Sequence, residues 1–196
     1  MTSGDLPVLT FADSASWEAW LEAHGSSSPG LWMKLAKSGA TSPTLTKAEA
    51  IEGALCHGWI DGQLGKLDAE HFLVRFTPRR PRSRWSAVNR DTAQRLIRAR
   101  RMRQAGLQAI EAAKADGRWD AAYAPQSRAE APPDLLEALG KNPSAEALFA
   151  KLDRANRYAI LYRVQDATRP ETRARRIAQF VDMLARGETI HPRKGG

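Results

Sequence analysis

Residues 58–86, GWIDGQLGKLDAEHFLVRFTPRRPRSRWS, contain two neighbouring candidate strands followed by an arginine-rich segment. Every second residue from Phe72 to Phe76 is large and apolar, which is the two-residue period of a half-exposed strand. We predict that residues 59–67 and 70–77 pair as antiparallel strands. The pair should end at Pro78, because a proline ring fixes φ and removes a backbone donor.

Outward from this pair, the sequence predicts two more strands and many helices. Residues 6–11 and 31–37 are β-prone, and Thr46 with Glu49 matches a capping box at the start of a helix. Helices are predicted over 16–24, 47–58, 87–102, 104–116, 134–140, 144–152, 154–165 and 170–186. This order predicts an α+β fold, a small antiparallel β-sheet with covering helices followed by a helical C-terminal region.

The linker candidate is APQSRAEAPP, residues 124–133, which is rich in proline and small residues. We therefore predict an α+β domain over residues 1–123 that includes the arginine-rich segment 75–103. A helical region over 134–190 and a tail over 191–196 should follow.

The positive charge is concentrated in one segment. The 196 residues carry a formal net charge of +8, yet residues 1–74 hold nine acids and only four bases. Residues 75–103 hold 11 arginines, no lysine and a single acid, Asp91. The composition therefore predicts a local arginine site rather than a general polyanion-binding surface.

The expected compartment is the cytoplasm. A single cysteine, Cys56, excludes an intramolecular disulfide and fits a reducing environment. No apolar run reaches the length of a membrane span, which predicts no membrane insertion. Residues 1–15 lack both a basic start and an apolar run of signal-peptide length, so export is not expected.

Four separated motifs resemble a known family. They are ALCHGWIDG (54–62), RFTPRRPRSRWSAVN (75–89), DGRWDAAY (116–123) and TRPETRARRI (168–177). Together they resemble the bacterial YdeI/OmpD-associated (bacteriocin-protection, OmdA) family, with a YdhG-like N-terminal domain. The resemblance implies the YdhG-like α+β fold, shared with a frataxin-like iron chaperone, and a small helical region after it. The family labels also suggest a role in stress or peptide-antibiotic resistance, but the family has no settled biochemical activity to transfer to these residues.

The arginine segment predicts a binding site for anions. Prolines stiffen it, so its guanidiniums should fan out, and arginine suits bidentate contacts with carboxylate or phosphate. Trp85 beside them is a candidate stacking ring, and Ser86 is a candidate N-cap. Arg90, Arg98 and Arg101 should extend the basic surface along the next helix. The alternative, which stays open, is that these arginines pair with the acids of residues 1–74.

On the last predicted helix, Arg173 aligns with the apolar stripe that should face the protein, and Arg176 borders it. An unpaired buried guanidinium is costly, so Arg173 needs a partner or a pocket. We expect Arg173, with Arg176, to reach toward the N-terminal domain. The equally open alternative is a salt bridge to an acid such as Asp61.

No catalytic residue, metal ligand or cofactor is predicted. Cys56 and His57 are adjacent on a helix and project about 100° apart, and no third group orients them. The four histidines fit no metal signature. Asp61 lies between two glycines, which favours turn geometry or an arginine partner over acid–base chemistry.

The expected function is the binding of an anionic small molecule, or of a carboxylate or phosphate group, in a groove between the two parts. The predicted ligand-binding residues are Arg79, Arg80, Arg82, Arg84, Trp85, Asn89, Arg173, Arg176, Trp59 and Asp61. Nucleic acid is disfavoured as a partner because no recognition motif is present, and no protein partner is identified.

The alternative is an iron-chaperone-like or stress-protective interaction protein without a small-molecule pocket. Its candidate iron ligands are the paired carboxylates Glu18/Glu22 and Glu49/Glu52, which share helix faces. An enzyme ranks third, because a base, a nucleophile and an orienting group cannot be assembled.

Overall fold

The computed structural model describes residues 6–125, 128–167 and 169–192. The first five residues, residues 126–127 of the predicted linker, Thr168 of the last motif and residues 193–196 of the tail lie outside them. The chain divides into two compact units, Met1–Ala122 and Tyr123–Gly196, which we call the N-terminal and the C-terminal unit.

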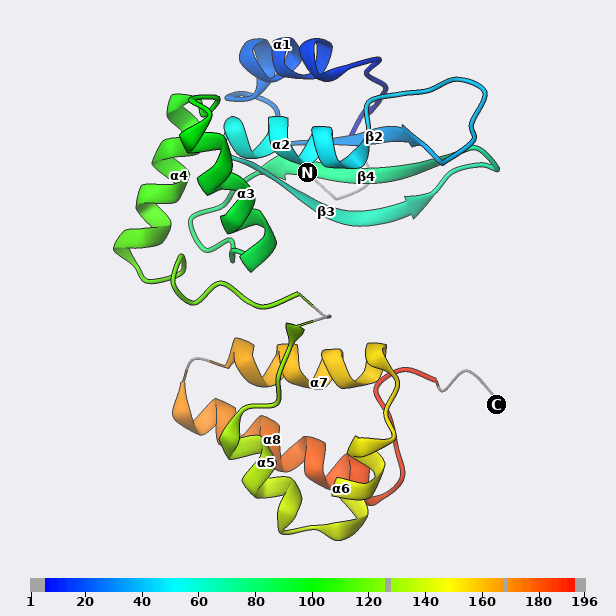
Figure 1. The fold of residues 1–196 in the computed structure, drawn as a ribbon, viewed down its shortest axis with the longest axis vertical. Helices are drawn as coiled ribbons and strands as arrows, with labels where there is room; N and C mark the ends of the chain where they lie inside the picture. The colour runs from blue at the N-terminus through cyan, green and yellow to red at the C-terminus, as the bar shows by residue number, and fades with distance from the viewer. Residues whose placement is uncertain (1–5, 126–127, 168, 193–196) are drawn as a thin grey trace. The chain divides into compact units, whose positions relative to one another are not determined.

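The N-terminal unit is built on a sheet of four strands within the described residues, in the order β1-β2-β4-β3 (Figure 1). The strands are β1 (Val8–Leu9), β2 (Leu31–Ala36), β3 (Trp59–Lys66) and β4 (His71–Pro78). The predicted antiparallel pairing of β3 with β4 is confirmed.

The prediction of a purely antiparallel sheet is wrong at one edge, because β1 runs parallel to β2. The helix α1 (Ser14–His24) connects these two strands. A helical crossover of this kind returns the chain in its starting direction, which gives parallel pairing. The sheet is therefore mixed.

Two helices cover one face of the sheet, α1 and α2 (Lys47–Cys56) (Figure 1). Their core is built around Trp17, which is fully buried and donates its indole N–H to the carbonyl of Ala50 at 3.0 Å. The predicted capping box of Thr46 and Glu49 is confirmed at the start of α2. Burial on one face of the strands explains their alternating pattern.

A second core lies beside the first, where α3 (Ala87–Arg98) and α4 (Gln104–Ala115) pack around Trp85. Ser86 caps α3 as predicted, its side chain accepting the N–H of Asn89 at 3.0 Å. The helix predicted to run to residue 102 ends earlier, at Arg98. The reason is local, since Arg100 adopts a left-handed conformation with φ of 56°.

The start of α4 meets the end of α2 at very close range. The backbone N–H of Arg103 donates to the carbonyl of Cys56 at 3.0 Å. A Cβ atom at Gly106 would lie 2.7 Å from the carbonyl oxygen of Leu55 and would also overlap that of Cys56. Only glycine fits this crossing, which holds α4 in its place.

The C-terminal unit contains four helices within its described residues, α5 (Pro133–Gly140), α6 (Pro143–Ala150), α7 (Arg154–Asp166) and α8 (Pro170–Ala185). They enclose a separate core that includes Leu135, Leu139, Ile160, Val164 and Leu184. The α+β class with a helical C-terminal region is thus confirmed. No helix in the described part of the chain is long and apolar enough to cross a membrane.

The tryptophans and the tyrosines lie in different units, so each unit has its own spectroscopic reporter. All six tryptophans belong to the N-terminal unit, and all three tyrosines, Tyr123, Tyr158 and Tyr162, belong to the C-terminal unit. Tryptophan fluorescence therefore reports unfolding of the first unit, and tyrosine ring signals report unfolding of the second.

Candidate functional site

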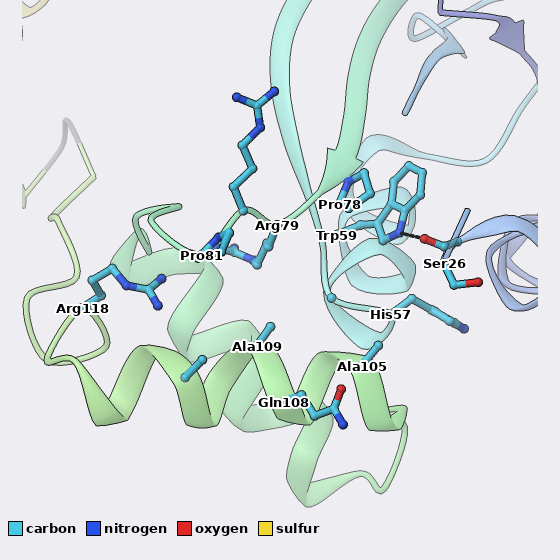
Figure 2. Close-up of a pocket in the computed structure, with 14 residues that line it drawn as sticks. Ser26, His57, Trp59, Pro78, Arg79, Pro81, Ala105, Gln108, Ala109 and Arg118 are labelled. Carbon is cyan, nitrogen blue, oxygen red and sulfur yellow. Dashed lines mark hydrogen bonds between the residues drawn. The ribbon is translucent and has the colours of Figure 1, made fainter. Parts of the chain in front are cut away.

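The N-terminal unit contains a cavity of about 430 Å³, which we call the arginine cavity (Figure 2). It lies among the loop after α1, the adjoining ends of β3 and β4, and α4. Its charged and polar wall residues are Ser26, His57, Arg79, Arg80, Gln108 and Arg118. Its apolar wall residues include Trp59, Pro78, Pro81, Ala105, Ala109 and Ala112. It lies wholly within one unit, whereas we predicted a groove between the two parts.

Arg79 is held in place by stacking. Its guanidinium carbon lies 3.6 Å from the centre of the Trp85 ring, and its Nη1 donates to the Arg84 carbonyl at 3.2 Å. Trp85 is only 2% exposed and packs edge-on against Trp119 at a centroid distance of 4.9 Å. The prediction of Trp85 as an open stacking ring for a ligand is therefore wrong, because the fold buries it and uses it to position Arg79.

Arg118 forms a second fixed guanidinium at the cavity. Its Nε donates to both carboxylate oxygens of Asp116 at 2.8 Å, and its Nη1 donates to the Ser83 carbonyl at 2.8 Å. The Arg118 hydrogen bond holds the pKa of Asp116 below its usual value. The sequence did not single out Arg118 as a site residue, although it lies in the motif DGRWDAAY.

Arg80 is the exposed member of the arginine cavity. Its backbone N–H donates to Ser83 Oγ at 2.9 Å, but its guanidinium has no hydrogen bond or ion pair with another residue in the described ranges. Arg80 also lines a neighbouring cavity of about 320 Å³ together with Asp61 and Arg75. The fold thus brings three predicted site residues, Arg79, Arg80 and Trp59, to one cavity and places Asp61 in the next.

Trp59 and His57 form the wall nearest the sheet. Trp59 is 1% exposed and donates its indole N–H to the Gly25 carbonyl at 3.1 Å (Figure 2). His57 Nδ1 lies 3.0 Å from the Gly53 carbonyl, and because a carbonyl only accepts, Nδ1 carries the proton. Next to His57, burial raises the pKa of the Cys56 thiol to about 11, so the thiol keeps its proton at neutral pH.

Seven of the ten predicted ligand residues do not line the arginine cavity, and three of these seven, Arg82, Arg84 and Asn89, lie near Arg79 in the sequence. Arg82 is exposed, and Arg84 contributes its carbonyl oxygen, which receives the Arg79 hydrogen bond. Asn89 lies in the first turn of α3. Their sequence proximity to Arg79 did not bring them to the cavity, because the chain turns at residues 81–82 and then enters a helix.

Several other arginines pair with the acids of the first 74 residues, which confirms the alternative interpretation for this part of the segment. The ion pairs are Arg95–Glu52, Arg101–Glu52, Arg101–Glu18 and Arg103–Glu22. Arg101 follows the end of α3, so the prediction that it extends the face of Arg90 and Arg98 is wrong. Partial burial opposes ionisation of Glu52, but Arg95 and Arg101 outweigh it and lower its pKa.

The same contacts engage the carboxylates of the iron alternative. Glu18, Glu22 and Glu52 bind arginines, and Glu49 accepts the backbone N–H of Thr46 at 2.9 Å. Within the described ranges, no group of three or more histidine, cysteine or acidic side chains is placed to hold a metal ion.

Arg173 and Arg176 bind acids of their own unit. Arg173 donates to Asp134 through Nε at 2.6 Å and through Nη2 at 2.9 Å, and its Nη1 donates to the Val164 carbonyl at 2.9 Å. Arg176 pairs with Asp166 at 3.1 Å. The alternative of a salt bridge for Arg173 is thus confirmed, but the partner is Asp134 instead of Asp61.

The Asp134–Arg173 pair should make the C-terminal unit sensitive to acid. The Arg173 hydrogen bond lowers the pKa of Asp134 in the folded state. The pair therefore stabilises the folded state at pH values above the pKa that Asp134 has in the unfolded chain. This stabilisation is lost as the pH falls through the pKa of Asp134 in the folded state. We expect the midpoint temperature of unfolding of this unit, followed by tyrosine ring NMR signals, to fall as the pH is lowered from about 5 to about 2.

In the variant Asp134→Asn, this acid-induced fall should be smaller than in the unchanged protein. Glu137→Gln is the matched control, because Glu137 pairs with Lys141 on the open surface, where both side chains are mostly exposed. An equal acid-induced fall in all three proteins would contradict the assigned role of Asp134.

Comparison with known families gives two matches, one within each unit. Residues 9–109 match a domain of unknown function (DUF8412). Residues 128–187 match the family described as Bacteriocin-protection, YdeI or OmpD-Associated (OmdA). The OmdA resemblance of the motifs is thus supported for the C-terminal unit, whereas the N-terminal match is to DUF8412. No curated protein and no solved structure matches the chain.

Proposed function

This chain belongs to the family that shares the DUF8412 domain, whose function is unknown. From the arginine cavity we propose that it binds a small organic anion. The ligand would present carboxylate or phosphate oxygens to Arg79, Arg80 and Arg118. The observation that carries the proposal is that three guanidiniums line one cavity, and that no carboxylate side chain of the described residues belongs to its lining.

The electrostatics of the cavity support this function. Two of the three guanidiniums are held before any ligand arrives, Arg79 by Trp85 and Arg118 by Asp116. Groups fixed in advance lose little conformational entropy on binding, so more of each interaction contributes to affinity. Arg80 is exposed and would close on the ligand, adding a charge-assisted hydrogen bond.

Arg80→Gln should weaken anion binding about tenfold, because a hydrogen bond to a charged group is lost. The measurement is calorimetric titration with citrate and with inorganic phosphate at low ionic strength, since screening by salt would hide the effect. Arg98→Gln is the matched control, as Arg98 is exposed on α3 and lies outside the cavity lining. If neither anion binds the unchanged protein, or if the two variants bind alike, the proposal fails.

The bacteriocin-protection description of the OmdA match supports a place for such binding in peptide-antibiotic or other stress resistance. The iron-chaperone-like alternative rests on the YdhG-like resemblance of the N-terminal motifs. Its candidate carboxylates bind arginines or cap a helix here, so the anion-binding function is the one that the geometry supports better.

A further inference from the structure

The wall of the arginine cavity that α4 provides is made of small side chains. Ala105, Ala109 and Ala112 follow the spacing that places residues on one helix face, and all three line the cavity. Figure 2 shows Ala105 and Ala109 on α4, on the side that faces Trp59 and His57. A longer side chain at any of these positions would occupy the space that the alanines leave open.

The cavity is larger than a carboxylate or phosphate group bound to the arginines would fill. Its volume of about 430 Å³ lies in the range of about 300–1,000 Å³ that is typical of sites for organic ligands. Besides the alanines, the apolar wall includes Trp59, Pro78 and Pro81. Water in contact with such a wall is displaced favourably by an apolar group.

The charged and apolar walls therefore suit a ligand that has one charged part and one apolar part. From the proposed anion-binding function, on which this step rests, we infer that the ligand is an aromatic carboxylate, with its carboxylate on the arginines and its flat ring against the wall of α4. The alanines of this wall carry only a methyl group, so a planar ring can approach the helix more closely than it could past longer side chains. Guanidiniums also stack on rings, which adds to the fit of an aromatic body.

A ligand series tests this inference on the unchanged protein. Acetate, benzoate and 2-naphthoate carry the same carboxylate on increasing ring area and are titrated by calorimetry at low ionic strength. We expect 2-naphthoate to bind at least about tenfold more tightly than acetate, because more apolar area leaves water. Equal affinities along the series would overturn the inference.

The variant Ala109→Leu tests whether the ring lies against α4. It should remove the advantage of 2-naphthoate over acetate and leave phosphate binding nearly unchanged. Ala115→Leu is the matched control, because Ala115 is exposed at the end of α4 and does not line the cavity. If 2-naphthoate keeps its advantage in Ala109→Leu, the ring does not lie against α4 and the inference is wrong.

The two proposals fail in different ways. If the unchanged protein binds 2-naphthoate no more tightly than acetate but still binds phosphate in an Arg80-dependent way, the aromatic ligand is rejected and the anion site is kept. If the unchanged protein binds neither the carboxylates nor phosphate, or if its binding does not depend on Arg80, the anion site is rejected as well. Tryptophan fluorescence confirms folding of each variant, and if Ala109→Leu does not fold, the series on the unchanged protein decides by itself.

Discussion

Replacing Trp85 by alanine should lower the free energy of unfolding of the N-terminal unit by about 3–5 kcal/mol. The side chain is 2% exposed, and it contacts both Trp119 and the guanidinium of Arg79. Its removal leaves a cavity in the second core and takes away the ring that positions Arg79. Urea unfolding followed by tryptophan fluorescence measures the loss, because all the remaining tryptophans lie in this unit.

Trp85→Phe separates ring packing from the indole N–H. The Trp85 Nε1 is buried and has no hydrogen-bond partner among the described residues, so phenylalanine removes an unsatisfied donor while keeping a ring. We expect this variant to lose less than about 1.5 kcal/mol. A loss as large as that of Trp85→Ala would show that a feature other than ring packing holds this core together.

Replacing Gly106 by alanine should destabilise the N-terminal unit by about 3 kcal/mol. The added Cβ would overlap the carbonyl oxygens of Leu55 and Cys56, which are backbone atoms that cannot rotate away. Helix α4 would have to move from the end of α2, and with it the alanine wall of the arginine cavity. Anion binding, measured by calorimetric titration, should therefore weaken as the free energy of unfolding falls.

Gly140→Ala is the matched control for this prediction. Gly140 is also a helical residue, the last of α5, but a Cβ there would meet no atom of the described residues within 4 Å. Alanine is favoured over glycine in helices by up to about 1 kcal/mol, so this change should be neutral or slightly stabilising. If Gly106→Ala were equally harmless, the close crossing of α2 and α4 would not be a constraint on the fold.

Local patterns along the chain were sufficient to predict the secondary structure of the sheet region. The alternation around Val74 and the capping box at Thr46 each depend on neighbours within a few residues, and both are confirmed. The parallel edge at β1 was missed because two residues, Val8 and Leu9, carry no signal of strand direction.

The candidate site was only partly predictable for a related reason. Proximity in sequence grouped Arg79 with Arg82, yet only Arg79 lines the cavity, since neighbouring residues in an extended and turning chain point in different directions. Arg118 was missed because 38 positions separate it from Arg80, and only packing of α4 and its following turn brings it near.

The α+β class, the order of most elements and the arginine-only segment with its local excess of charge could all be predicted from the amino-acid sequence. These follow from periodicity, capping and composition, which act over short distances along the chain. The packing of the chain was needed to show which arginines form ion pairs with acids, as Arg101 does with Glu18 and Glu52, and which line a cavity. That division depends on contacts between residues far apart in sequence, because a guanidinium binds whichever carboxylate the fold brings within reach.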